Sequence, residues 1–146
     1  MSSAYLKKTL YYQRDTTSQI KISNNRKNKL KEGDEIIFNG HLFSDKKHTK
    51  PLAKTSICYK IASILKNGMI ITASLCFNFS DGVIEFMGNI FSSTFDIENG
   101  IIKEYTTMPE NLSVIRGTNA FKSAHGNCKY VINGPGVGDI KMNVSV

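Results

Sequence analysis

Alternation of apolar and polar residues is the clearest pattern in this chain. Over the range Met69–Phe79 the odd positions from 71 to 79 are apolar, and most of the even positions between them are polar. The alternation resumes after Gly82, where Glu85 stands between Ile84 and Phe86. A period of two is typical of a β-strand with one buried face, so the sequence predicts two neighbouring strands here.

Hairpin turns are the second signal. Asn67-Gly68, Asp81-Gly82 and Asn99-Gly100 each stand between β-prone residues, a pattern that favours tight turns between antiparallel strands. Helical periodicity is weak throughout. Further strands are predicted at Tyr5–Tyr12, Gln19–Ser23, Glu35–Phe43, Lys54–Leu65, Val114–Arg116, Lys129–Asn133 and Asp139–Val144. Many short strands joined by tight turns indicate an all-β antiparallel barrel or sandwich. A length of 146 residues fits one domain, 1–146.

The range Ile115–Gly126 combines glycine and turn-forming residues with one aromatic residue, Phe121. Gly117 and Gly126 can adopt backbone angles that other residues avoid, so we expect a tight turn that returns Phe121 to the core. The same range resembles the glycine-rich signature near the end of the allene oxide cyclase and dirigent families. Other matches are Tyr12-Gln13-Arg14-Asp15, Gly33-Asp34, Leu42-Phe43, Cys58 and the hairpin Phe77–Ile84.

The resemblance implies a single antiparallel eight-stranded β-barrel that encloses an apolar ligand. Residues 91–112 are longer than the cyclase equivalent and have no aligned counterpart. Leu10 and Tyr12 stand where the plant cyclases have a glutamate and an asparagine. We therefore expect no allene oxide cyclase activity and assign no catalytic residue. The resemblance and the alternation together predict a ligand-binding wall of Leu10, Tyr12, Ile36, Phe38, Gly40, Cys58, Lys60, Ile71, Phe77, Phe79 and Phe86.

The strand near Cys58 carries two conflicting signals. The family register points Cys58 and Lys60 into the barrel, whereas hydrophobicity alone would bury Ile57, Tyr59 and Ile61. A one-residue slip exchanges the two faces. If the family register holds, Lys60 lines the pocket mouth or the apolar stripe is covered, for which a homodimer or homotrimer is expected. As a small wall residue, Cys58 needs no activated thiol.

Charge and cysteine content limit the other functions. The net charge is +7, and residues 1–66 hold 14 of the 19 lysines and arginines. The basic run Arg26–Lys31 lacks interleaved aromatic residues, so we interpret it as a solvated loop and expect no nucleic-acid partner. The three cysteines lack Cys-x-x-Cys spacing, which predicts free, buried thiols in a reducing compartment. We expect no metal site, no cofactor, no membrane span and a cytoplasmic location.

Three functions follow from these expectations. The first is a cofactor-independent cyclase or isomerase that acts on an apolar polyene-like or fatty-acid-derived metabolite, because ring closure depends mainly on holding the reactive ends together. The second is a non-catalytic dirigent-like or carrier protein that binds or orients a lipophilic ligand. A basic module that binds nucleic acid or anionic surfaces rests on charge alone.

Overall fold

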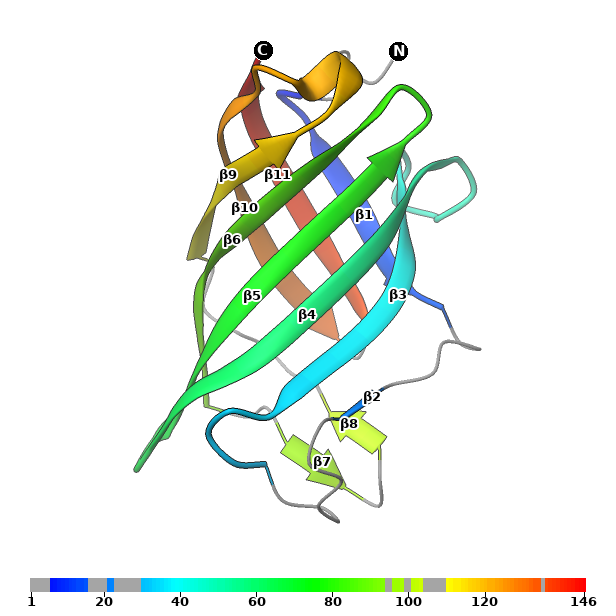
Figure 1. Ribbon diagram of the computed structural model, residues 1–146. Helices are drawn as coiled ribbons and strands as arrows, with labels where there is room; N and C mark the ends of the chain where they lie inside the picture. Colours follow the sequence, from blue (N-terminus) through cyan, green and yellow to red (C-terminus); the bar gives the residue numbers. More distant parts are fainter. Residues whose placement is uncertain are drawn as a thin grey trace.

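The structure is a computed structural model that describes residues 6–15, 21–22, 30–93, 96–98, 101–103, 110–134 and 136–146. Eight long antiparallel strands form a closed β-barrel (Figure 1), which confirms the predicted fold class. In chain order they are β1 (Thr9–Arg14), β3 (Glu35–Phe43), β4 (Pro51–Leu65), β5 (Gly68–Phe79), β6 (Gly82–Ser92), β9 (Glu110–Gly117), β10 (His125–Gly134) and β11 (Val137–Ser145).

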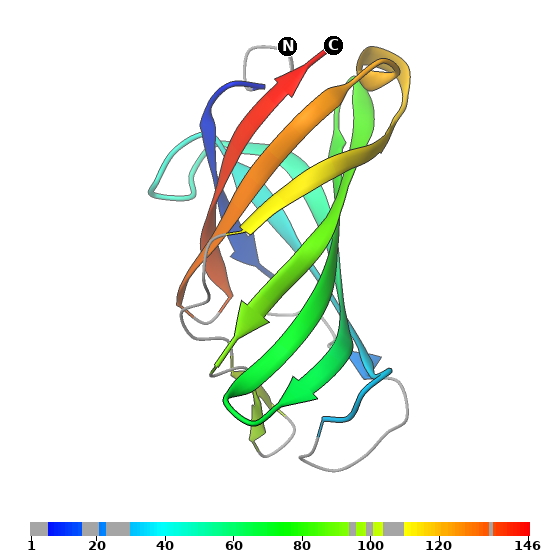
Figure 2. The same cartoon turned by 90° about the vertical axis from the view of Figure 1, so that its left-hand side faces the viewer.

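Two small additions extend this barrel. The short β2 (Lys21–Ile22) pairs with β3, and β7 (Asp96–Glu98) pairs with β8 (Ile101–Lys103) in a separate two-stranded sheet. Both views place these additions at the end of the barrel where β4 turns into β5 (Figures 1 and 2). The β7–β8 hairpin lies within residues 91–112, which the sequence comparison left without a counterpart. Within the described part of the chain, no helix is long and apolar enough to cross a bilayer.

The pairing of β1 with β3 closes the barrel. The sheet runs in the order β1-β11-β10-β9-β6-β5-β4-β3, and β3 then pairs back onto β1. Arg14 lies opposite Gly40 in this seam. A Cβ atom on Gly40 would run into the carbonyl oxygen of Gln13 and lie only 2.9 Å from Cε1 of Tyr12. Glycine at position 40 therefore allows the two backbones to meet.

Burial alternates along the strands as predicted. On β5 the side chains of Ile71, Ala73, Leu75, Phe77 and Phe79 are all buried, and those of the intervening residues are more exposed. The same inward set on β6 includes Ile84, Phe86 and Ile90. Because each inward row faces the same closed interior, these side chains form one continuous core.

Two of the three predicted hairpins are present with their turns among the described residues. In each, the two-residue turn lies one position earlier than predicted, so the glycine is not part of the turn. Leu65 pairs with Gly68 and Phe79 with Gly82, so the turn residues are 66–67 and 80–81 and each glycine begins the next strand. A Cβ on Gly68 would lie 2.6 Å from the carbonyl oxygen of Ser92, and one on Gly82 would lie 2.5 Å from that of Thr118. Close approach of another segment therefore requires these glycines. The predicted turn at Asn99-Gly100 and the basic residues 26–29 lie outside the described residues.

The turn between β9 and β10 returns Phe121 to the core, as predicted. Its side chain is 1% exposed, and its ring centroid lies 5.5 Å from that of Phe79. A Cβ on Gly117 would overlap the carbonyl oxygen of Phe121, so glycine is needed where the turn folds back. Phe121 thus covers the end of the barrel where β5 turns into β6.

We expect the substitution Gly40→Ala to destabilise the barrel at its closing seam by about 1–3 kcal/mol, the usual cost of overpacking. The matched control is Gly134→Ala, because a Cβ there would meet only Cγ2 of Val137 at 3.4 Å. Urea unfolding followed by circular dichroism measures both variants. Equal stability of the two variants would show that the seam tolerates a methyl group.

Candidate functional site

Aromatic side chains from six strands converge in the barrel interior. The rings of Phe38 and Tyr59 meet edge to face with their centroids 5.1 Å apart, and the ring centroids of Phe77 and Phe86 are 5.5 Å apart. These contacts give the interior a rigid aromatic lining. The fully buried aromatic residues of the strands are Tyr12, Phe38, Tyr59, Phe77, Phe86 and Tyr130.

Polar atoms are set into this lining. The hydroxyl oxygens of Tyr12, Tyr59 and Thr55 are buried, and that of Thr55 has no hydrogen-bond partner among the described residues. Buried hydroxyls are costly in an apolar surrounding unless they form hydrogen bonds. The interior therefore offers hydroxyl groups beside aromatic rings, a combination that suits a ligand with an apolar body and a few polar atoms.

Arg14 places a positive charge at one end of this interior. It continues the inward register of Leu10 and Tyr12 on β1. Its guanidinium carbon lies 5.5 Å from the ring centroid of Phe38, a cation–π geometry, and its Nη1 atom is buried. The backbone N–H of Arg14 donates to the carbonyl oxygen of Gly136, 2.7 Å away, beside the β10–β11 turn. That turn and Phe121 lie at opposite ends of β10.

Nine of the eleven residues predicted to form the wall point inward. They are Leu10, Tyr12, Ile36, Phe38, Gly40, Ile71, Phe77, Phe79 and Phe86, and all nine are buried. Contact of these residues with a ligand stays a prediction. Arg14, Thr55 and Tyr130 are not among the predicted wall residues. The period of two could have found Arg14, because it follows Leu10 and Tyr12 at the same spacing.

The register of β4 corrects the expectation taken from the resemblance. Lys60 is exposed and Cys58 is half-buried, both on the outer face. Ile57, Tyr59 and Ile61 are buried inside the barrel, each 1% exposed or less. Hydrophobic burial therefore sets the face of this strand. The apolar stripe that suggested an oligomer interface belongs to the core, so it gives no support to a homodimer or homotrimer.

All three cysteines are free, as predicted, but only Cys128 is buried, whereas Cys58 and Cys76 are half-buried. Burial raises the pKa of Cys58, and the nearby Glu35 carboxylate raises it further. Burial and Glu85 raise the pKa of Cys76 in the same way, and burial alone raises that of Cys128. A thiol with a raised pKa is a poor nucleophile at neutral pH. We expected Cys58 to act only as a wall residue, which needs no activated thiol. Its raised pKa is consistent with an unactivated thiol.

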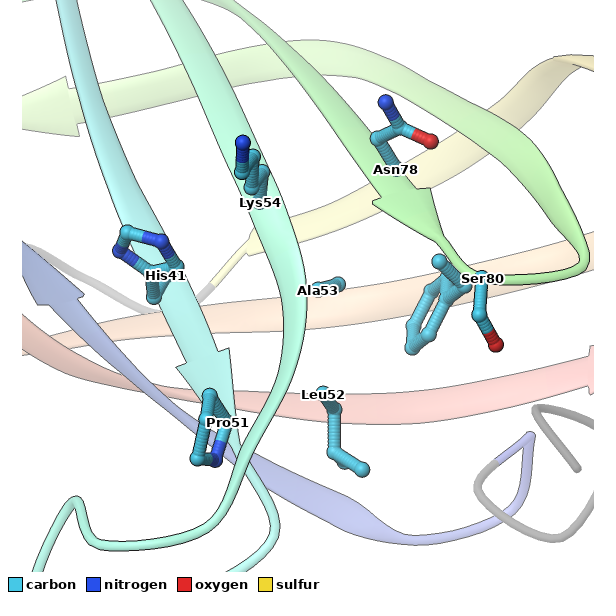
Figure 3. Close-up of a pocket in the computed structure, with 8 residues that line it drawn as sticks. His41, Pro51, Leu52, Ala53, Lys54, Asn78 and Ser80 are labelled. Carbon is cyan, nitrogen blue, oxygen red and sulfur yellow. The ribbon is translucent and has the colours of Figure 1, made fainter.

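The outer face of β3, β4 and β5 carries a groove of two adjoining hollows. His41, Lys54 and Asn78 border both of them (Figure 3). One hollow, of about 460 Å³, is bordered also by Pro51, Leu52, Ala53, Phe79 and Ser80. The other, of about 560 Å³, is bordered also by Asp15, Asn39, Gly40, Thr55, Ser56 and Cys76. No three His, Cys, Asp or Glu residues of the described chain are placed to hold a metal ion.

Comparison with known proteins gives a fold but no family. No family model and no curated protein matches the chain. Among solved structures, the chain is similar to a pyocyanin demethylase, with a TM-score of 0.65 and 16% identity. The similarity covers 94% of this chain and 98% of that one. It supports a shared barrel fold without singling out the allene oxide cyclase family.

We expect iodoacetamide to modify the cysteines of the folded protein more slowly at pH 7 than those of the urea-unfolded chain, because burial disfavours the thiolate. Mass spectrometry measures the rates, and modification of Cys128 should require unfolding. A thiol that reacts faster in the folded protein would reveal an activated nucleophile.

The folded protein holds the thiol protons more tightly than the unfolded chain, whose thiols have the ordinary pKa of 9.0. The unfolded chain therefore loses these protons first as the pH rises. We expect this contribution to the free energy of unfolding to be complete below pH 9.0 and to fall above it. Urea unfolding at several pH values tests the sign.

Proposed function

We propose that the barrel interior binds a small, mainly apolar metabolite and converts it by cyclisation or isomerisation without a cofactor. The observation that carries the proposal is the buried aromatic lining that includes the hydroxyls of Tyr12, Tyr59 and Thr55. Polyene-like and fatty-acid-derived molecules fit such a lining because most of their surface is apolar. The similar structure is named for an activity on pyocyanin, which supports a small-molecule substrate.

Cyclisation suits this interior because it rearranges bonds within one molecule. Atoms and electrons balance without a redox partner, and holding the reactive ends together supplies much of the rate. Fixed aromatic walls such as Phe38 and Tyr59 restrict the conformation of a flexible chain. The buried tyrosine hydroxyls can donate hydrogen bonds to a developing oxyanion, and the Arg14 guanidinium adds positive charge at one end of the interior.

A carrier that binds the same class of ligand without converting it is the second candidate. The same lining supports it, since the pKa of each of the three cysteines is raised, the direction opposite to that of an activated nucleophile. The two functions differ in the fate of the ligand. A cyclase or isomerase releases a product of unchanged mass with a different retention time and ultraviolet spectrum, whereas a carrier releases the ligand unchanged.

The first test concerns binding inside the barrel. Polyunsaturated fatty acids, a polyene and pyocyanin serve as the ligand panel, and a thermal shift reports stabilisation of the folded state. We expect Ala73→Leu, which adds bulk to a fully buried inward position on β5, to weaken binding at least about tenfold. Ala62→Leu is the matched control, because Ala62 is exposed on β4.

Circular dichroism of Ala73→Leu first establishes that the variant is folded. If it is not, Tyr12→Phe takes its place, with Tyr11→Phe on the outward position of β1 as control. Binding by wild type that neither interior variant weakens would place the ligand elsewhere. Failure of the wild type to bind any member of the panel would overturn the proposed apolar ligand class.

The second test concerns conversion. We expect Phe38→Leu to lower turnover about 10- to 100-fold, because the ring fixes the folded pose of the ligand and a displacement near 1 Å is costly. Cys58 lies on the outer face of β4, so the substitution Cys58→Ser should leave turnover unchanged. Liquid chromatography with mass detection measures the isomeric product. Binding without any isomeric product would favour the carrier.

A further inference from the structure

We propose that the outer groove across β3, β4 and β5 is a second binding site, for a small amphipathic carboxylate such as a medium-chain fatty acid. Its centre is a cross-strand row in which His41 pairs with Lys54 and Lys54 pairs with Asn78. Figure 3 shows these three side chains on three adjacent strands. This site lies on the outside of the barrel wall and does not depend on the function proposed for the interior.

Lys54 supplies the charge that recognises the carboxylate. Its side chain is exposed and forms no ion pair with any residue that the structure describes. The acidic residue bordering the groove, Asp15, contacts His41 within the same groove: its Oδ1 atom accepts a hydrogen bond from Nδ1 of His41 over 2.8 Å. Because a carboxylate can only accept, Nδ1 carries the proton. Asp15 therefore makes its hydrogen bond to the imidazole and no ion pair with Lys54, whose ammonium group can meet an anion.

Neutral donors flank this lysine. Asn78 is exposed beside it on β5, and Ser56 follows it on the same face of β4. An amide and a hydroxyl can each donate a hydrogen bond to a carboxylate oxygen. Beyond Cys76, Glu85 accepts from Arg116 at 2.8 Å, so this second carboxylate is also paired. The charge and donors of this half of the groove fit one anionic group with oxygen acceptors.

The other half of the groove supplies the apolar contact. Pro51, Leu52, Ala53 and Phe79 border the hollow of about 460 Å³, which Ser56 does not border. Ala53 and Phe79 are buried in the barrel core, so the carbon surface that faces this hollow comes from Pro51, which is exposed, and Leu52, which is half-buried. An alkyl chain attached to the bound carboxylate would cover them and remove apolar area from water. The adjacency of one cation and one apolar hollow selects an amphipathic carboxylate over a fully polar anion.

Octanoate is the probe for this site. Titration of the 15N-labelled protein, followed by amide chemical shifts, should move the resonances of His41, Leu52, Lys54 and Asn78. We expect Lys54→Gln to raise the dissociation constant about tenfold, since it removes one charge-assisted hydrogen bond. Lys60→Gln is the matched control, because Lys60 is exposed on the same face of β4 and does not border the groove.

Two further ligands separate the contributions of charge and chain. Inorganic phosphate tests the anion alone and 1-octanol tests the chain alone, and each should bind at least about tenfold more weakly than octanoate. Equal binding of phosphate or of octanol would overturn the amphipathic assignment. Shifts centred on Tyr12 and Phe38 would place octanoate inside the barrel and overturn the outer site while supporting the interior one. Absence of octanoate binding, or equal effects of Lys54→Gln and Lys60→Gln, would also overturn it.

Discussion

The pairing of β1 with β3 is the constraint on which the rest of the structure depends. Without it both strands would present unpaired backbone groups at the edges of an open sheet. The pairing requires glycine at position 40, because a larger residue would collide with the backbone of Gln13. Once the seam closes, the inward side chains of all eight long strands share one interior. The candidate ligand site exists only because of that closure.

The two ends of the closed barrel differ in chemistry. At one end Phe121 folds back against Phe79, which makes this end aromatic and apolar. Toward the other end, next to the β10–β11 turn, Arg14 packs over Phe38 and brings a positive charge into the lining. A ligand with an apolar body and a polar or anionic terminus would therefore have a preferred orientation in the interior.

One strand, β4, serves both proposed sites because its two faces lie on opposite sides of the barrel wall. Thr55 and Tyr59 face the interior, whereas Lys54 borders the outer groove. The register of this strand decides which residue types meet which ligand, since a shift of one position would exchange the faces. Burial of Ile57, Tyr59 and Ile61 outweighs the register suggested by family resemblance, because exposing this apolar stripe would forfeit its hydrophobic stabilisation.

The sequence by itself determined the strands, two of the hairpins, the return of Phe121 and most of the interior wall, because these follow from local periodicity and turn chemistry. It left the face of β4 open, although hydrophobicity pointed to the correct one. Only the tertiary structure decided that Arg14 lies against Phe38, and that Asp15, His41 and Lys54 border one groove. The residues that meet come from segments far apart in the sequence, and their contacts arise from cross-strand register and barrel closure, which no local pattern in the sequence specifies.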